Sequence, residues 1–244
     1  MATPPEVAAR VGTHAGAMIE VWDADLSAPQ LPDVRLAALL SPEELARCGR
    51  FHFERDRVRF LRRRAFRRLC LAARLGLAAR DLEFRLGAHG KPAVAGAPED
   101  FEFNDSGSGA RALLATCFGG KVGVDLEEHR PFDEDLAAVI GRFASDEQHQ
   151  LLACDPLQRA PRFFECWVRK EAFVKAVGLG LHLPLESFSV PVAPDAVAAA
   201  VKWPGDPVSG RPWWVTSIEL GVGWSAAVVS DRPDCVRRTP WSWR

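Results

Sequence analysis

The sequence predicts an α+β fold in which two similar halves follow one another in a single chain. Helical and strand patterns succeed one another in one order up to the Gly119-Gly120 turn, and this order recurs loosely after it. At 244 residues, with 48% hydrophobic residues, the chain is long enough for one large or two medium domains with a sizeable core. We therefore expect an N-terminal half at residues 1–120, a C-terminal half at 121–230 and a C-terminal tail at 231–244.

The first half is expected to combine one helical region with four strands. Residues 41–75 form two helical stretches, and Gly, Pro and Ala dominate a loop at 87–98. Strands are expected near residues 19–26, 82–86, 101–103 and 112–118.

The second half is expected to begin with a strand at 122–127 and to contain a long helix at 163–177. That helix has no Gly or Pro and stops at Gly178. The tail is expected to be loose despite Trp241 and Trp243. Shorter helices are expected near 136–143 and 146–153, and strands near 188–192, 213–220 and 224–229.

Composition indicates an ordered cytoplasmic protein with reduced thiols. Residues 1–17 lack an apolar run of signal-peptide length, and no stretch approaches the ~20 apolar residues of a membrane span. The six cysteines are scattered without a Cys-x-x-Cys motif. Nine arginines fall within 55–74, but apolar residues recur there at helical spacing and the formal net charge is −1. We interpret the run as the basic face of an amphipathic helix and expect neither a membrane nor a nucleic-acid partner.

Two carboxylates share one face of the strand expected at 122–127. Apolar residues occupy the alternate positions, so Asp125 and Glu127 lie side by side on the polar face. Two such charges repel each other unless a cation lies between them. The strand therefore presents candidate ligands for a cation.

Glu171 lies in the helix expected at 163–177, four residues after Trp167 and three before Val174. On a 3.6-residue period it projects among large apolar side chains, where a carboxylate needs a partner. Lys175, one turn further on, can be that partner as an ordinary helix pair worth about 0.2–0.5 kcal/mol. Taken alone, this pair is the simpler interpretation.

The joint occurrence of the three carboxylates favours a metal site. Asp125, Glu127 and Glu171 form an all-oxygen set that suits Mg²⁺, which keeps some waters and completes its coordination with substrate phosphates. Mn²⁺ would fit the same set. Lys170 and Lys175 would then serve the phosphates instead of the carboxylates. The sequence thus predicts a Mg²⁺ site built for a diphosphate.

Five motifs follow one another along the chain. The two strongest are Val-Gly-Val-Asp-Leu-Glu at 122–127 and Trp-Val-Arg-Lys-Glu-Ala-Phe-Val-Lys at 167–175. They are accompanied by an arginine-rich segment at 41–59, a Gly-Lys-Pro turn at 90–92 and the segment 178–190. Together they resemble the signature of the 4'-phosphopantetheinyl transferases, specifically the surfactin-synthetase type with two similar halves in one chain. The resemblance covers about residues 19–230.

The resemblance implies an activity. Members transfer the 4'-phosphopantetheine arm of coenzyme A to a serine of an acyl- or peptidyl-carrier protein and release adenosine 3',5'-bisphosphate. It implies an active site in the cleft between the halves and, because one chain supplies both halves, a monomer.

The resemblance also implies roles for residues. Asp125, Glu127 and Glu171 would hold Mg²⁺, and Lys175 would stabilise the leaving phosphate. Glu171 and Glu127 are both candidates for the general base, of which we favour Glu171. The positions expected to contact coenzyme A are Arg47, Arg59, Gly90, Lys91, Asn104, Ser106, Gly107 and Lys175.

Residues 103–108 depart from the family pattern. Members usually carry a histidine, which reaches the diphosphate, where this chain has Gly107, and an apolar residue where it has Asp105. A glycine leaves its backbone N–H available to a phosphate. Arg111 or His89 can supply charge nearby.

Three other functions are compatible with parts of the sequence. Another Mg²⁺ phosphotransferase or phosphohydrolase would release product without a carrier protein. A non-catalytic module for coenzyme A or carrier protein would explain Gly107 as lost chemistry, although the intact carboxylate set argues against it. A nucleic-acid binder acting through residues 55–74 would show steeply salt-dependent oligonucleotide binding.

Overall fold

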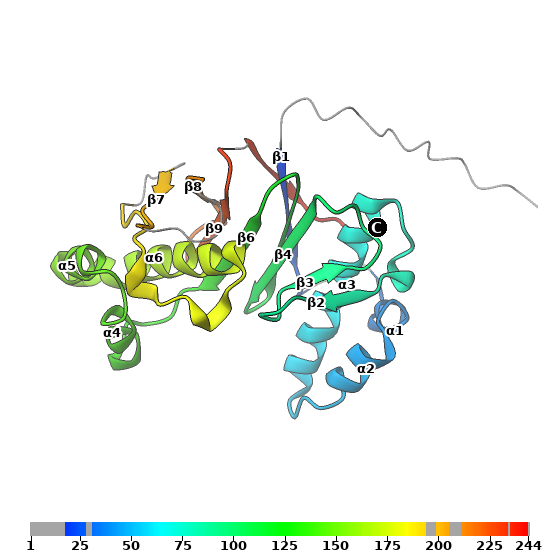
Figure 1. Ribbon diagram of the computed structural model, residues 1–244. Coiled ribbons are helices and arrows are strands. Elements are labelled where there is room, and N and C mark those ends of the chain that lie inside the picture. The colour runs from blue at the N-terminus through cyan, green and yellow to red at the C-terminus, as the bar shows by residue number, and fades with distance from the viewer. Residues whose placement is uncertain (1–17, 28–30, 194–198, 205–210, 234, 244) are drawn as a thin grey trace, which may run out of the picture.

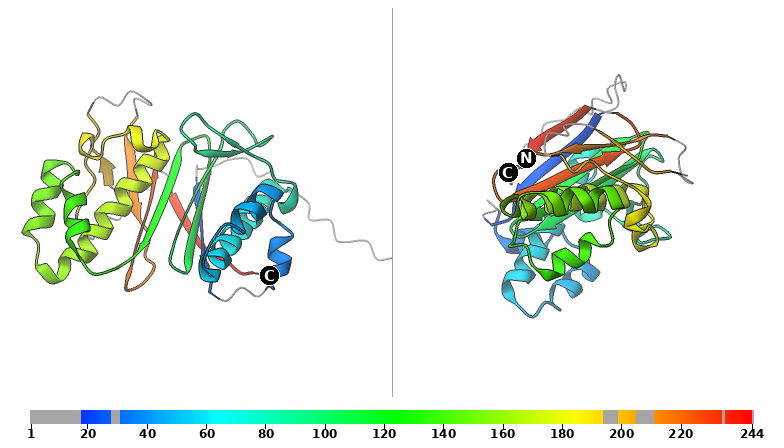
Figure 2. Two further views of the ribbon diagram at one scale, coloured as in Figure 1. Left: turned by 90° about the horizontal axis from the view of Figure 1, so that it is seen from below. Right: turned by 90° about the vertical axis from the view of Figure 1, so that its left-hand side faces the viewer.

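The computed structural model describes residues 18–27, 31–193, 199–204, 211–233 and 235–243 (Figure 1). It contains two four-stranded sheets and a short hairpin, with long helices outside the two sheets (Figures 1 and 2). The predicted α+β fold with two sheet-containing halves is confirmed.

The first sheet belongs to the N-terminal half and has the order β10-β1-β5-β4. The 22-residue helix α3 packs on one of its faces, where Phe66, Leu71 and Leu114 belong to one buried cluster. Its strands are β1 (Met18–Asp25), β4 (Phe101–Ser108), β5 (Arg111–Phe118) and β10 (Cys235–Pro240), and its helices are α1 (Asp33–Ala37), α2 (Pro42–Cys48), α3 (Glu54–Leu75) and η1 (Ala79–Asp81). The hairpin consists of β2 (Phe84–Leu86) and β3 (Pro92–Val94).

The second sheet has the order β6-β9-β8-β7 and is covered by α6. Helix α6 begins at Pro156 behind an Asp155 side chain that caps it and ends at Gly178, whose φ of 81° suits glycine. The strands are β6 (Val122–Glu128), β7 (Ala199–Val201), β8 (Trp213–Ser217) and β9 (Trp224–Ser230). The helices are α4 (Glu134–Ile140), α5 (Ser145–Ala153), α6 (Pro156–Val177), η2 (Gly180–His182) and η3 (Leu185–Ser187).

The two sheets pack against each other through the faces that their helices leave uncovered. A third buried cluster joins β1 and β5 of the first sheet to β6 and β9 of the second, with Val21, Leu113, Val124 and Val228 among its members. Side chains on a strand alternate between faces, so β1, β5 and β9 have one apolar set for their helix and another for the opposite sheet, whereas β6 turns Gly123, Asp125 and Glu127 toward α6. The edge strands β4 and β6 lie side by side at this junction (Figures 1 and 2).

The predicted loose tail is wrong for the residues that the structure describes. Strand β10 pairs in parallel with β1, from Met18 opposite Cys235 to Asp23 opposite Pro240. Trp243 is 5% exposed, and its indole N–H donates to the Asp25 carbonyl at 3.0 Å. The sequence pattern does not predict this strand, because its side chains are mostly exposed and polar, as suits a sheet edge.

Other differences concern short elements. The loop predicted at 87–98 contains β3, and a strand predicted at 188–192 is reduced to one bridge between Ser189 and Lys202. The long helix begins seven residues earlier than predicted: Pro156 occupies its first turn, where a missing N–H costs nothing, and the helix also contains Pro161. None of the described helices is long and apolar enough to cross a membrane.

Candidate active site

Gly123 allows α6 to lie directly on β6. A Cβ at this position would overlap the Ala172 carbonyl oxygen and the Ala176 nitrogen, and it would approach the Ala176 Cα to 2.9 Å. Glycine therefore permits a backbone approach that any side chain would prevent. This contact sets the helix residues Glu171 and Lys175 beside the strand carboxylates.

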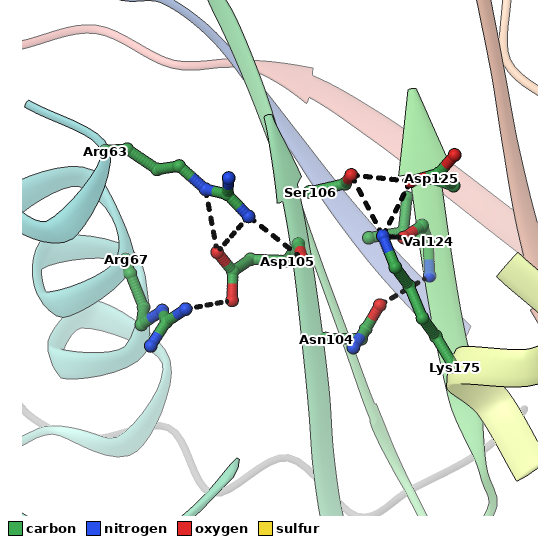
Figure 3. A network of polar contacts seen from close by, with 8 residues as sticks. All are labelled: Arg63, Arg67, Asn104, Asp105, Ser106, Val124, Asp125 and Lys175. Carbon is green, nitrogen blue, oxygen red and sulfur yellow. Dashed lines mark hydrogen bonds and ion pairs between the residues drawn. The ribbon is translucent and has the colours of Figure 1, made fainter. Parts of the chain in front are cut away.

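Asp125 is the centre of a polar network between β4, β6 and α6 (Figure 3). The Ser106 hydroxyl donates to Asp125 Oδ1 at 2.6 Å, and the Lys175 ammonium lies 2.6 Å from the same oxygen. Lys175 also donates to the Ser106 hydroxyl oxygen at 3.1 Å. The predicted residues Asp125, Ser106 and Lys175 are thus brought together from both halves.

A second contact joins the same two strands one step further on. The Ser108 hydroxyl donates to Glu127 Oε2 at 2.7 Å. Asn104 adds a third link, since its side-chain oxygen accepts from the Val124 N–H at 2.9 Å. Three alternate residues of β4 therefore fasten its free edge to β6.

Glu171 and Glu127 both have a raised pKa in this site. Burial raises the pKa of Glu171, and the charges of Asp125 and Glu127 raise it further, while the charge of Lys175 opposes them. Burial and the charge of Asp125 likewise raise the pKa of Glu127, against the hydrogen bond from Ser108. Glu171 has no hydrogen bond or ion pair with any described residue that would relieve this.

The donor set fits a divalent cation shared with other ligands. Asp125 Oδ2 is buried and has no hydrogen-bond partner, so it is an oxygen with unused acceptor capacity. As they stand, no three His, Cys, Asp or Glu side chains of the described segments approach closely enough to form a metal site. An ion held by Asp125, Glu127 and Glu171 would therefore need water or phosphate oxygens as well, which is the usual situation of Mg²⁺.

A cleft of about 650 Å³ opens beside this network. Glu171, Lys175 and Asn104 line it together with the predicted residues Gly90 and Lys91. Its apolar wall comes from the second half and consists of Trp167, Val174, Leu181, Leu183, Pro184 and Leu185.

The ammonium of Lys91 is directed into the protein. It pairs with the Glu102 carboxylate at 2.9 Å and donates to the carbonyl oxygens of Val122 at 3.1 Å and Ala176 at 3.3 Å. Burial lowers the pKa of Lys91, which the neighbouring Glu102 opposes. The two carbonyl contacts link the N-terminal half to the C-terminal half, and a phosphate contact of this side chain stays a prediction.

Two of the predicted coenzyme A contacts lie elsewhere. Arg47, an exposed residue of α2, lines a separate hollow with Arg50 and Phe51. Arg59 is half-buried on α3 and is not among the residues that line the cleft. Their proposed contacts with the phosphates also stay predictions.

Asp105 and two arginines form a network that the sequence did not indicate. Arg67 Nη2 lies 2.6 Å from Asp105 Oδ1, and Arg63 Nη2 lies 3.2 Å from Asp105 Oδ2 (Figure 3). Burial alone would raise the pKa of Asp105, but Arg67 and Arg63 outweigh it and hold that pKa well below its usual range. The available signal was the four-residue spacing of the arginines on one helix face.

Lys170 is a structural residue, and the prediction that it serves phosphates is wrong. Its side chain is completely buried and pairs with Glu147, also completely buried, at 2.7 Å. It further donates to the carbonyl oxygens of Leu185 at 2.8 Å and Phe188 at 2.9 Å. Lys175 follows Lys170 by five positions, so the two side chains leave the helix on different faces.

Arg111 does not supply charge at Gly107. Its guanidinium pairs with Asp23 at 2.9 Å and donates to the Leu220 carbonyl at 2.6 Å. His89 lies at the cleft, with its ring centre 5.2 Å from that of His182.

The fold and site define a class: a two-half α+β protein with clustered carboxylates and a lysine at the junction, a combination suited to phosphoryl transfer. A family model described as the 4'-phosphopantetheinyl transferase superfamily matches residues 121–219, and one described as 4'-phosphopantetheinyl transferase, N-terminal, matches residues 28–119. The chain belongs to the 4'-phosphopantetheinyl transferase family, which confirms the sequence-based identification.

Two curated relatives illustrate the extent of the match. The 4'-phosphopantetheinyl transferase Sfp of Bacillus subtilis is 31% identical over 200 residues, which cover 82% of this chain and 86% of that protein. The 4'-phosphopantetheinyl transferase HetI of Nostoc is 34% identical over 191 residues, which cover 76% of this chain and 80% of that protein. The similarity therefore includes both halves and not one motif alone.

Proposed function

We propose that this protein transfers the 4'-phosphopantetheine arm of coenzyme A to a serine hydroxyl of an acyl- or peptidyl-carrier protein. The new bond joins the serine oxygen to the phosphorus that carries the arm, and the bond from that phosphorus to the bridging oxygen breaks. Adenosine 3',5'-bisphosphate leaves with the bridging oxygen, and the serine proton goes to a base. Family membership supports this reaction, and the single structural observation that carries it is the meeting of Asp125, Glu171 and Lys175 beside the cleft.

Asp125, Glu127 and Glu171 are the residues proposed to hold Mg²⁺, with Mn²⁺ as a substitute. The buried, unpartnered Asp125 Oδ2 and the mutual repulsion of the three carboxylates support this assignment. When bound, such an ion supplies charge neutralisation at the diphosphate oxygens.

Glu171 is the proposed general base. It lines the cleft, and its carboxylate has no competing partner among the described residues, whereas the Glu127 carboxylate accepts from Ser108. A base must lie within hydrogen-bond reach of the proton that it takes. Glu171, which lines the cleft, satisfies this better than Glu127, which already accepts a hydrogen bond from Ser108.

Lys175 is proposed to bind the leaving phosphate. Its side chain is 28% exposed while its ammonium contacts Asp125, so a short movement brings it to an anion in the cleft. Gly90, Asn104 and Ser106 are proposed contacts of coenzyme A on the opposite side. Arg47 and Arg59 remain candidates for its outlying phosphate.

The decisive experiment is intact-mass spectrometry of apo carrier proteins incubated with this protein, coenzyme A and Mg²⁺. A mass gain of one phosphopantetheine group that disappears with chelator supports the transferase and its metal dependence. Fatty-acid, polyketide and nonribosomal-peptide carriers in one panel would also reveal the preferred pathway. Coenzyme A binding without any gain would instead indicate a binding module that has lost catalysis.

The protein is proposed to work as a cytoplasmic monomer. Both sides of the cleft come from one chain, and a shared apolar cluster holds them together. Sedimentation at working concentration, with and without coenzyme A, tests the oligomeric state.

A further inference from the structure

Arg63 lies where a side chain at position 107 would be. A Cβ on Gly107 would approach the Arg63 side chain at 2.9 Å to Cδ, 3.0 Å to Nε and 3.1 Å to Nη1. A side chain at position 107 would therefore have to displace this arginine from its place beside β4. The glycine and the arginine are complementary features of the fold.

Asp105 fixes the direction of Arg63. The Arg63 Nε donates to Asp105 Oδ2 at 3.2 Å, and Nη2 donates to the Asp105 carbonyl oxygen at 3.5 Å. The Nη1 group, by contrast, has no hydrogen bond or ion pair among the described residues. The side chain is 33% exposed, so a guanidinium held on one side keeps donors available on the other.

The surroundings of Arg63 contain more positive than negative charge. Arg63, Arg64 and Arg67 gather around the carboxylate of Asp105, and the Glu44 carboxylate, which pairs with Arg68, also acts on Arg64. Burial and then the charges of Arg67 and Arg63 lower the pKa of Arg64 to about 10. An anion beside this cluster would relieve the repulsion.

Gly107 lies on β4 between two residues of the carboxylate network, so the arginine cluster is close to that network along the strand. Gly107 lies between Ser106 and Ser108, whose hydroxyls bond to Asp125 and Glu127. These serines and Gly107 lie on opposite faces of β4, as Figure 3 shows for the neighbouring pair Asp105 and Ser106. Residues 103–106 of β4 are buried, but Gly107 and Ser108 are partly exposed, so a ligand can reach this end of the strand.

We propose that Arg63, held by Asp105 across Gly107, binds the diphosphate of coenzyme A from the N-terminal half, opposite Lys175. The guanidinium would give two donors to phosphate oxygens, the geometry in which arginine exceeds lysine. This inference rests on the proposed function and names a specific anion-binding residue for it.

The test is calorimetric binding of coenzyme A and dephospho-coenzyme A, measured with chelator present so that no metal contributes. Arg63→Ala should weaken both ligands by the same factor, about tenfold or more, because both contain the diphosphate. Arg63→Lys should weaken them less. Arg55→Ala, on the same helix with a side chain 70% exposed, is the matched control and should leave both affinities unchanged.

Gly107→Ala gives an independent test that retains the arginine. Its methyl group should displace Arg63 and weaken both ligands, yet it should add little in the Arg63→Ala background. Additive effects of the two substitutions would contradict the proposal, as would an Arg63→Ala protein that binds both ligands like Arg55→Ala.

The outcomes separate this inference from the proposed function. Loss of affinity for coenzyme A alone would place Arg63 at the 3'-phosphate and overturn the assignment. A wild-type protein that modifies carriers while Arg63→Ala binds normally would leave the transferase intact and reject Arg63. A wild-type protein that binds neither ligand would reject the function itself.

Discussion

Asp125 illustrates how single residues acquire their properties from neighbours. One carboxylate oxygen contacts Ser106 and Lys175, while the other is buried without a partner. Two residues away, Glu127 accepts from Ser108, and Glu171 has no such contact among described residues. The three carboxylates of one site thus differ in how many of their oxygens are free to bind a cation or to accept a proton.

Glu171→Gln should reduce turnover far more than binding. We expect kcat to fall by about a hundredfold or more, the scale of general-base catalysis, while coenzyme A affinity without metal changes little. Glu165→Gln on the same helix, where Glu165 pairs with Arg162 at 3.2 Å, is the control. Normal turnover of carrier protein by Glu171→Gln would refute the assignment.

Asp105→Asn should destabilise the protein in a pH-dependent manner. Removing this charge leaves Arg63 and Arg67 without their counter-ion, which costs about 3 kcal/mol at neutral pH for a buried pair. The pKa of Asp105 is lowered in the folded state, so its contribution is complete above the unfolded pKa and is lost as pH falls. The difference in free energy of unfolding should therefore narrow below about pH 4. A difference that stays constant from pH 7 to pH 3 would show that charge is not its source.

At the scale of elements, the contact between α6 and β6 builds the site. Helix α6 supplies Glu171 and Lys175, and β6 supplies Asp125 and Glu127. Their separation is set by Gly123, which lies against the helix backbone. The glycine two residues before the first carboxylate of this motif thus sets the distance between the β6 carboxylates and α6.

Gly123→Ala should be severely destabilising. The atoms that the new methyl group meets belong to the backbone and cannot move without separating helix from strand, so we expect about 3 kcal/mol or more. Gly141→Ala should stay within about 0.5 kcal/mol, because its φ of −59° is helical and its Cβ would meet only Ala138 O at 3.4 Å. Chemical denaturation measures both, and equal stabilities would contradict the close approach.

At the scale of the whole molecule, the halves are one packed unit. A single apolar cluster includes residues of both sheets, and β10 returns from the second half to pair with β1. The cleft is therefore held open between elements that have little freedom to separate. The boundaries of the two halves at residues 1–120 and 121–230 stay a prediction.

Trp243→Ala tests the anchoring of the returning strand. The indole packs with Phe66 and Trp241 in the N-terminal core, and its loss should cost about 3–5 kcal/mol. Arg237→Ala on β10, an exposed position, should cost less than about 0.5 kcal/mol. If thermal and chemical unfolding of Trp243→Ala matched those of Arg237→Ala, the strand would have no role in stability.

The sequence by itself determined the family, the two-half fold and the residues of β6 and α6, because strand and helix periodicities and short motifs are local properties. It could not decide the partners of those residues. Lys170 and Lys175 look alike in the sequence, yet one is completely buried against Glu147 and the other lies at the cleft. Likewise, only packing brings Arg63 across Gly107 and β10 beside β1, because both contacts join residues far apart in the chain.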